Sequence, residues 1–77
     1  MVRPAGKVQP ITNDAKDYLS GDVIAWQMNG RLVHIGMISK VKVEEADRYA
    51  VVHNIGAGAR LEDVLFAWKI TGHYRYF

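Results

Sequence analysis

Two histidines are the residues of this 77-residue sequence best suited to chemistry. His34 lies inside a long apolar run, and His53 closes a second apolar run that begins at Tyr49. An imidazole can exchange a proton near neutral pH, and a second imidazole hydrogen bonded to it can fix which ring nitrogen carries that proton. If the two side chains meet, one ring therefore orients the other for proton transfer.

The spacing of the two runs predicts that they pair as antiparallel strands. If their charged connection is symmetric about the bond between Val43 and Glu44, His34 lies directly opposite His53. Side chains at directly opposed positions lie on one face with Cβ atoms about 4.5–5.5 Å apart. A shift of one residue would send the rings to opposite faces. Gly36 leaves room for a neighbouring group to approach closely.

Each histidine also has an alternative interpretation that involves no chemistry. The neighbours of His34 are apolar, so its ring could be a core imidazole that a backbone carbonyl satisfies. His53 could be an ordinary histidine at the end of a strand. The spacing of His34, His53 and His73 matches no compact metal motif, so we expect no metal site and no cofactor.

The elements that must position the histidines are short. We expect a small α+β domain with an antiparallel, partly curled sheet and one short helix. The apolar residues Leu61, Val64, Leu65 and Trp68 have the spacing of one helical face, with Glu62 in the first turn. The expected strands are Val23–Trp26, Arg31–Ile38, Tyr49–His53 and His73–Phe77.

Proline, glycine and asparagine residues between these elements indicate the domain organisation. Residues 1–19 carry both prolines and show no sustained period, so we expect an extended lead-in, followed by a single domain over residues 20–77. Asn29 and Gly30 between the first two apolar runs predict a tight hairpin turn. Gly56 and Gly58 predict a loop after the third strand.

The composition excludes several classes of protein. The chain contains no cysteine, which excludes disulfides, thiolate zinc sites and a cysteine nucleophile within it. No apolar run is long enough to cross a bilayer, and the N-terminus has no signal-peptide stretch. The net charge is +2, and the basic residues are spread among acidic ones. We therefore expect neither a membrane nor a nucleic acid as partner.

Three phrases of the sequence follow one another in a suggestive order. They are Gly21–Trp26 (GDVIAW), His34–Ile38 (HIGMI) and Val51–Asn54 (VVHN). This succession resembles the NlpC-type, papain-like cysteine peptidases, which cut bacterial cell-wall peptides. The longer phrases over residues 53–58 and 62–76 resemble a narrower bacterial family of unknown function within that clan. The resemblance covers roughly residues 18 to 77.

The resemblance implies roles for three residues. His34 matches the general base that activates a cysteine thiolate, and His53 matches the residue that orients this base. Asn54 is the fallback orienting residue. The family's cysteine lies on a helix upstream of the Gly-Asp strand, and this chain has no such helix. The resemblance thus implies the sheet half of a papain-like fold without its nucleophile.

Two functions from different classes follow. The first is a truncated or divergent NlpC-type hydrolase module for peptide or amide bonds of cell-wall type, inactive alone. Its partner would be a missing cysteine-bearing half. The second is a stand-alone binding or assembly module shaped like a small barrel, or one that associates with itself. Nucleic-acid binding is a weaker third possibility. Localisation stays open, because the resembled family is usually exported and this chain shows no export signal.

Overall fold

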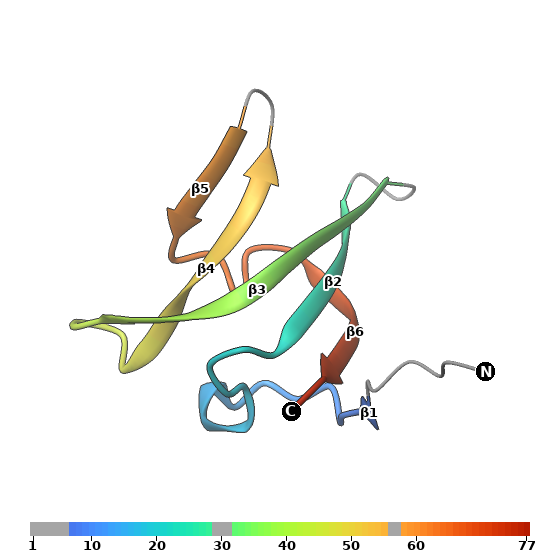
Figure 1. Cartoon of the computed structure of the whole chain (residues 1–77), viewed down its shortest axis with the longest axis horizontal. Coiled ribbons are helices and arrows are strands. Elements are labelled where there is room, and N and C mark those ends of the chain that lie inside the picture. Colours follow the sequence, from blue (N-terminus) through green and yellow to red (C-terminus); the bar gives the residue numbers. More distant parts are fainter. Residues whose placement is uncertain (1–6, 29–31, 56–57) are drawn as a thin grey trace.

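The computed structural model describes residues 7–28, 32–55 and 58–77. Its strands form one antiparallel sheet in the order β1-β6-β2-β3-β4-β5 (Figure 1). A single turn of 3-10 helix, η1, precedes β2. The elements are β1 Lys7–Val8, η1 Ala15–Asp17, β2 Val23–Met28, β3 Leu32–Val43, β4 Arg48–Ile55, β5 Gly58–Glu62 and β6 Lys69–Arg75.

The expected antiparallel sheet is confirmed, and the finer expectations need correction. The described part of the chain forms six strands instead of four. The sheet is open, with β1 and β5 at its two edges. The barrel shape that was expected for a binding module is therefore wrong. A strand pair joins β2 to β3 as expected, while Asn29 and Gly30 of the expected hairpin turn lie outside the described residues.

The expected helix over Leu61–Trp68 is wrong. Leu61 and Glu62 end strand β5, and irregular turns follow them up to β6. The apolar spacing arose by coincidence, because Leu61 points out from the sheet at 48% exposure whereas Leu65 is buried at 1%. Two contacts fix the turn instead: the Trp26 indole N–H donates to the Leu65 carbonyl at 2.9 Å, and Asp63 accepts two bonds from a guanidinium on β4.

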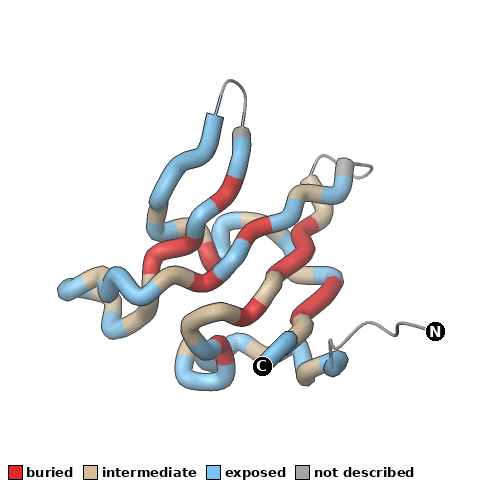
Figure 2. Tube along the Cα trace, in the orientation of Figure 1, coloured by how far each residue is buried: buried red, intermediate tan, exposed pale blue. Residues whose placement is uncertain are grey.

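The core lies on one face of the sheet. Alternation along each strand sends one side chain in two to this face. Red segments in Figure 2 lie on β2, β3, β4 and β6. On the central strand β2 three successive residues are buried, Ile24, Ala25 and Trp26. The turn after β5 and the segment before β2 cover this inner face, contributing Leu65 and Tyr18 respectively. The buried hydrophobic cluster consists of Tyr18, Ile24, Trp26, Ile38, Val51 and Leu65.

A buried ionic cluster fastens the N-terminal segment to the sheet. The Asp22 carboxylate is fully buried and accepts two hydrogen bonds from Arg75, each 2.8 Å long. The His73 Nε2 atom lies 2.5 Å from Asp22 Oδ2, and His73 Nδ1 lies 2.9 Å from the carbonyl of Pro10. The His73 ring stacks on Tyr18. Residues 7–19 of the expected lead-in thus pack on the sheet.

Two neighbours hold the His73 ring in place. Burial opposes ionisation of Asp22, but hydrogen bonds from Arg75 and His73 outweigh it and hold the pKa of the Asp22 carboxyl below its ordinary value. His73 bridges the Asp22 carboxylate and the Pro10 carbonyl through its two ring nitrogens. His73 therefore has a structural role.

Candidate functional site

His34 on β3 and His53 on β4 form a hydrogen bond. The Nε2 atom of His34 lies 2.8 Å from the Nδ1 atom of His53, and the two rings are nearly perpendicular at 84°. The side chain of His53 is fully buried, while His34 is half-buried. The structure therefore brings together the two histidines that the sequence singles out.

The strand register differs from the predicted one by two residues. His53 pairs directly with Gly36, so His34 meets His53 diagonally. The rings still share a face, because a shift of two residues preserves the alternation of side chains, whereas a shift of one would reverse it. Diagonal neighbours remain within reach of long or aromatic side chains.

A later turn and an irregularity in β3 together set this register: Val43 pairs with Arg48, so the turn is centred two residues beyond the assumed position, and the irregularity reverses part of the resulting shift. Ile38 pairs with Val51 and Lys42 pairs with Tyr49, so β3 has two more residues than β4 over this interval. The Ser39 hydroxyl donates to a carbonyl of β4 at 2.7 Å and supports the bulged segment. The connection is thus not symmetric about the position assumed from the sequence.

Glu62 completes the site, and the sequence analysis missed it. The His53 Nε2 atom lies 2.8 Å from the Glu62 Oε1 atom, and the carboxylate is 41% exposed. Glu62 was assigned to the first turn of a helix, although it ends strand β5. If β4 and β5 had been expected to pair as a hairpin, the contact between Glu62 and His53 could have been predicted. Glu62 pairs with Val51, which lies two residues before His53 on the same face.

These contacts set a direction along the three side chains. The Glu62 carboxylate only accepts, so His53 Nε2 carries a proton and donates it. In a neutral His53 ring, Nδ1 is then an acceptor, and His34 Nε2 donates to it. The lone pair of His34 is left on Nδ1, which bonds to no other described residue. The arrangement therefore ends in an unprotonated nitrogen on the half-buried ring.

Two tryptophans fix the position of the imidazoles. The fully buried Trp26 ring stacks on His34 with centroids 5.5 Å apart and planes 26° apart. The Trp68 ring packs edge-to-face against both imidazoles, with ring centroids 5.8 Å from His34 and 6.0 Å from His53. Gly36 makes this packing feasible, because a Cβ there would lie 2.6 Å from the Trp26 ring. The expectation that a group approaches Gly36 closely is confirmed.

The surroundings favour the neutral form of His34. Burial of the ring lowers the pKa of His34 below its ordinary value of 6.5, and so, to a smaller extent, does the repulsion that a second proton on the imidazole pair would meet from His53. A histidine with a lowered pKa is unprotonated at neutral pH. His34 is thus in the state in which an imidazole accepts a proton.

Asn54 does not join this arrangement. It follows His53 directly on β4, so its side chain points to the other face, where it is exposed. No hydrogen bond connects it to His34. The residue that orients His53 is Glu62.

A groove lies beside Trp68. This groove of about 550 Å³ is lined by Trp68, which also contacts both imidazoles. Its lining is more apolar than polar. The other lining residues are Ile11, Thr12, Asn13, Phe66, Lys69 and Ile70.

Metal and membrane sites are not apparent in the described ranges. No group of three or more histidine, cysteine, aspartate or glutamate side chains there could hold a metal ion. Over the same residues, the structure has no helix of the length and apolar character that crossing a membrane requires.

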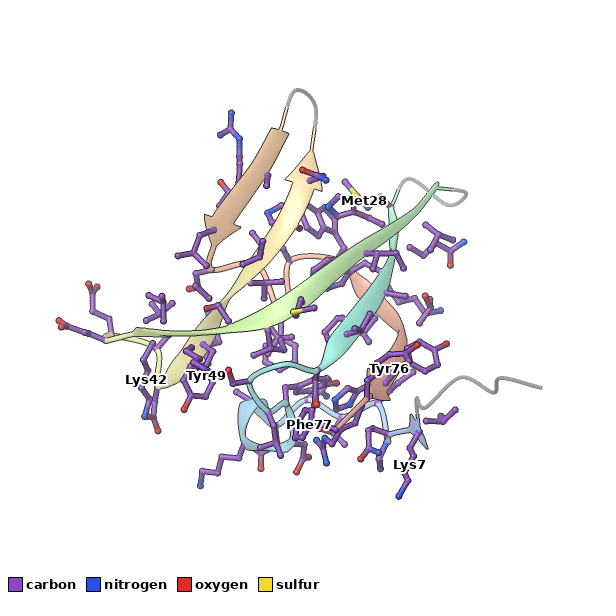
Figure 3. The ribbon with its side chains drawn as sticks, viewed as in Figure 1. Lys7, Met28, Lys42, Tyr49, Tyr76 and Phe77 are labelled. Carbon is purple, nitrogen blue, oxygen red and sulfur yellow. The ribbon has the colours of Figure 1, made fainter. Side chains whose placement is uncertain are left out.

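Figure 3 shows the labelled Met28 at one end of β2, and Tyr76 and Phe77 near the opposite end.

Comparisons with known proteins place the chain without assigning it an activity. Residues 2–76 match a family described as a domain of unknown function, DUF1287. The uncharacterized protein YijF of Escherichia coli (strain K12) is 45% identical over 71 residues, which are 92% of this chain. These residues are 34% of YijF, so the chain spans about a third of that relative's length. No solved structure matches.

The identification with NlpC-type, papain-like peptidases is wrong. The matching family is a domain of unknown function, its relative YijF is uncharacterized, and neither finding links the chain to that clan. The chain also has no cysteine to serve as the nucleophile of such an enzyme. The short phrases around the two histidines are too brief to identify a family, and the cell-wall substrate inferred from them has no support.

Proposed function

The chain belongs to the DUF1287 family, and we propose that its histidine pair is the general base of a hydrolytic site acting on amide or ester bonds. The observation that carries the proposal is the directed series Glu62–His53–His34, with hydrogen bonds of 2.8 Å at both steps. A carboxylate that orients one imidazole, which orients a second, leaves a defined nitrogen ready to accept a proton.

The reaction follows from the protonation states. His34 Nδ1 takes a proton from a nucleophile as the nucleophile attacks the carbonyl carbon. The charge that forms on His34 is stabilised through His53 by the Glu62 carboxylate. In the second half of the reaction, His34 returns the proton to the leaving group. The imidazole therefore acts first as base and then as acid.

The nucleophile comes from outside the described side chains of the site. The chain contains no cysteine, and no hydroxyl group bonds to His34. A water molecule or a side chain from another segment would supply the attacking atom. The groove along Trp68, whose ring contacts both imidazoles, offers space for the apolar part of a substrate.

The first test reads the proton positions directly. Two-bond ¹H–¹⁵N spectra of the 77-residue chain at neutral pH distinguish the two ring nitrogens of each histidine. We expect His34 and His53 to carry their protons on Nε2, with both Nδ1 atoms unprotonated. A proton on Nδ1 of His34 would reverse the direction of the series and refute the assignment of the base.

The second test measures hydrolysis in a longer chain. A chimera replaces the 71 matched residues of YijF with this chain and is assayed against amide and ester substrates. We expect His34→Gln to lower the rate about 100-fold or more, which is typical of the loss of a general base. Glu62→Gln should lower it less, and Glu44→Gln on an exposed turn serves as the matched control. Unchanged turnover in His34→Gln would exclude the proposed role.

A binding or assembly function remains a second candidate. The observation that favours it is a continuous set of exposed apolar side chains on the face of the sheet away from the histidines. That face carries the inference below, which does not depend on hydrolysis.

A further inference from the structure

Five large apolar side chains project from one side of β3, β4 and β5. The strand registers place them together: Met37 pairs with Val52, and Val52 pairs with Leu61. Directly paired residues lie on the same face, as do residues two apart on a strand. We call this surface the outer face, made of Val33, Ile35, Met37, Val52 and Leu61.

The outer face is exposed to an extent unusual for such residues. Val33 is 66% exposed, Ile35 54% and Met37 50%. On the inner face of the same strands, Ile38 is 2% exposed and Val51 is fully buried. One side of the sheet is thus packed, while the other presents a contiguous apolar surface of the kind that marks an interaction site.

Charged side chains on this face lie at its margins: Gln27 pairs with both Val33 and Lys69, and Arg48, four residues before Val52 on β4, forms an ion pair with Asp63. Asn54 and Ala59 pair with each other beside the five side chains. The charged residues Arg60 and Glu62 of β5 alternate with Ala59 and Leu61, so they belong to the inner face. Sheets that face water usually place polar residues on their solvated side. The outer face therefore has the composition of a surface that another polypeptide covers.

We propose that the occupant is the part of the family's longer chain that this sequence does not match. About two thirds of YijF lies outside the residues it shares with this chain. At 45% identity over the shared region we expect the relative to form the same sheet, and the rest of its chain is long enough to supply a covering segment. The occupant packs apolar side chains against Val33, Ile35 and Met37, whether it is joined to the sheet or supplied as a separate chain.

Oxidative footprinting of Met37 tests this proposal. Hydroxyl radicals oxidise methionine in proportion to its exposure, so the isolated 77-residue chain gives the uncovered rate. The comparison is the chimera in which this chain replaces the matched residues of YijF, with both rates normalised to a reference peptide. We expect oxidation of Met37 to fall about fivefold or more in the chimera, because the occupant excludes solvent from a side chain that is otherwise half exposed.

Variants separate this contact from general shielding. Ile35→Glu combined with Val52→Lys places charges on the outer face and should restore rapid oxidation of Met37 in the chimera. Both residues are exposed in the isolated chain, which should fold as before. Val8→Glu changes an even more exposed apolar residue on β1 and should leave Met37 protected. Protection that persists in the charged double variant would contradict the proposal.

Two further results would overturn it. Equal oxidation of Met37 in the chimera and the isolated chain would mean that the remainder of the longer chain packs elsewhere. Sedimentation of the isolated chain as a dimer that Ile35→Glu dissociates would assign the outer face to a second copy. Either result leaves the histidine site untouched, so failure here is distinct from failure of the proposed hydrolysis.

Discussion

His53 lies directly across the sheet from Gly36, and this pairing determines how the imidazoles meet. The missing side chain at Gly36 is replaced by the ring of Trp26, which reaches under the strand and stacks on His34. Val51 closes the same space from β4. The absence of a side chain at Gly36 therefore makes room for the indole that packs against His34.

Gly36→Ala should destabilise the chain by about 1–3 kcal/mol, the usual cost of overpacking a core. The new Cβ would lie 2.6 Å from Trp26 and 2.8 Å from Val51, so the indole must move away from His34. Urea unfolding measures the loss. Gly58→Ala is the matched control, since no atom lies within 4 Å of its Cβ, and an equal loss there would contradict this explanation.

His34 should make the stability of the chain depend on pH. Because burial and the repulsion that a second proton would meet from His53 lower its folded pKa below 6.5, the unfolded state binds more protons below that pH. The free energy of unfolding should therefore fall as pH drops from 6.5 toward the folded pKa. His34→Gln removes this contribution, so its unfolding free energy should decline less between pH 7.5 and about 5.5. Identical pH profiles would show that His34 is not perturbed.

Glu62→Gln should lower the pKa of His34 further. The carboxylate favours positive charge on the imidazole pair, and the amide removes that charge without removing the acceptor oxygen. Titration of the His34 ring protons by NMR measures the change. Glu44→Gln, on the exposed turn between β3 and β4, removes the same charge elsewhere. A shift of equal size in both variants would reflect net charge alone.

Asp22→Asn should cost about 3–5 kcal/mol at neutral pH, as expected when one partner of a buried ion pair is removed. The amide leaves Arg75 without its counter-ion and removes the carboxylate partner of His73. The pKa of Asp22 is lowered from 3.8, so this stabilisation is present above 3.8 and is lost as pH falls through the folded pKa.

Chemical denaturation over a range of pH checks the effect of Asp22. The difference between Asp22→Asn and the unchanged chain should shrink below pH 3.8. Asp47→Asn is the matched control, because Asp47 pairs with Lys42 at the surface and its loss should matter little. Should the two variants behave alike, the buried cluster would not be a major source of stability.

The strands were predictable where local patterns sufficed. The apolar runs at residues 23–26 and 49–53 become parts of β2 and β4, because alternating or continuous apolar residues favour burial in a sheet. The segment from Leu61 was not predictable in the same way. Its helical spacing conflicts with strand pairing to β4, and the tertiary pairing prevails.

The site was predictable only in part. The residue types at 34 and 53, and an even difference in register, were enough to bring the two imidazoles to one face. Glu62 escaped notice because its role depends on a hairpin between β4 and β5, and nothing local to Glu62 indicates that partner. The side chain of Asn54 points to the opposite face of β4, so it makes no contact with His34.

The sequence by itself determined that this chain has an apolar sheet, no cysteine and a pair of histidines on neighbouring strands, since composition and alternation are local properties. Only the tertiary structure decided the direction of the hydrogen bonds that join Glu62, His53 and His34. That direction requires a carboxylate from β5, an indole from β2 and a gap at Gly36 on β3 to meet at one point. Such contacts depend on the registers of several strand pairs at once, and no single segment of the sequence encodes them.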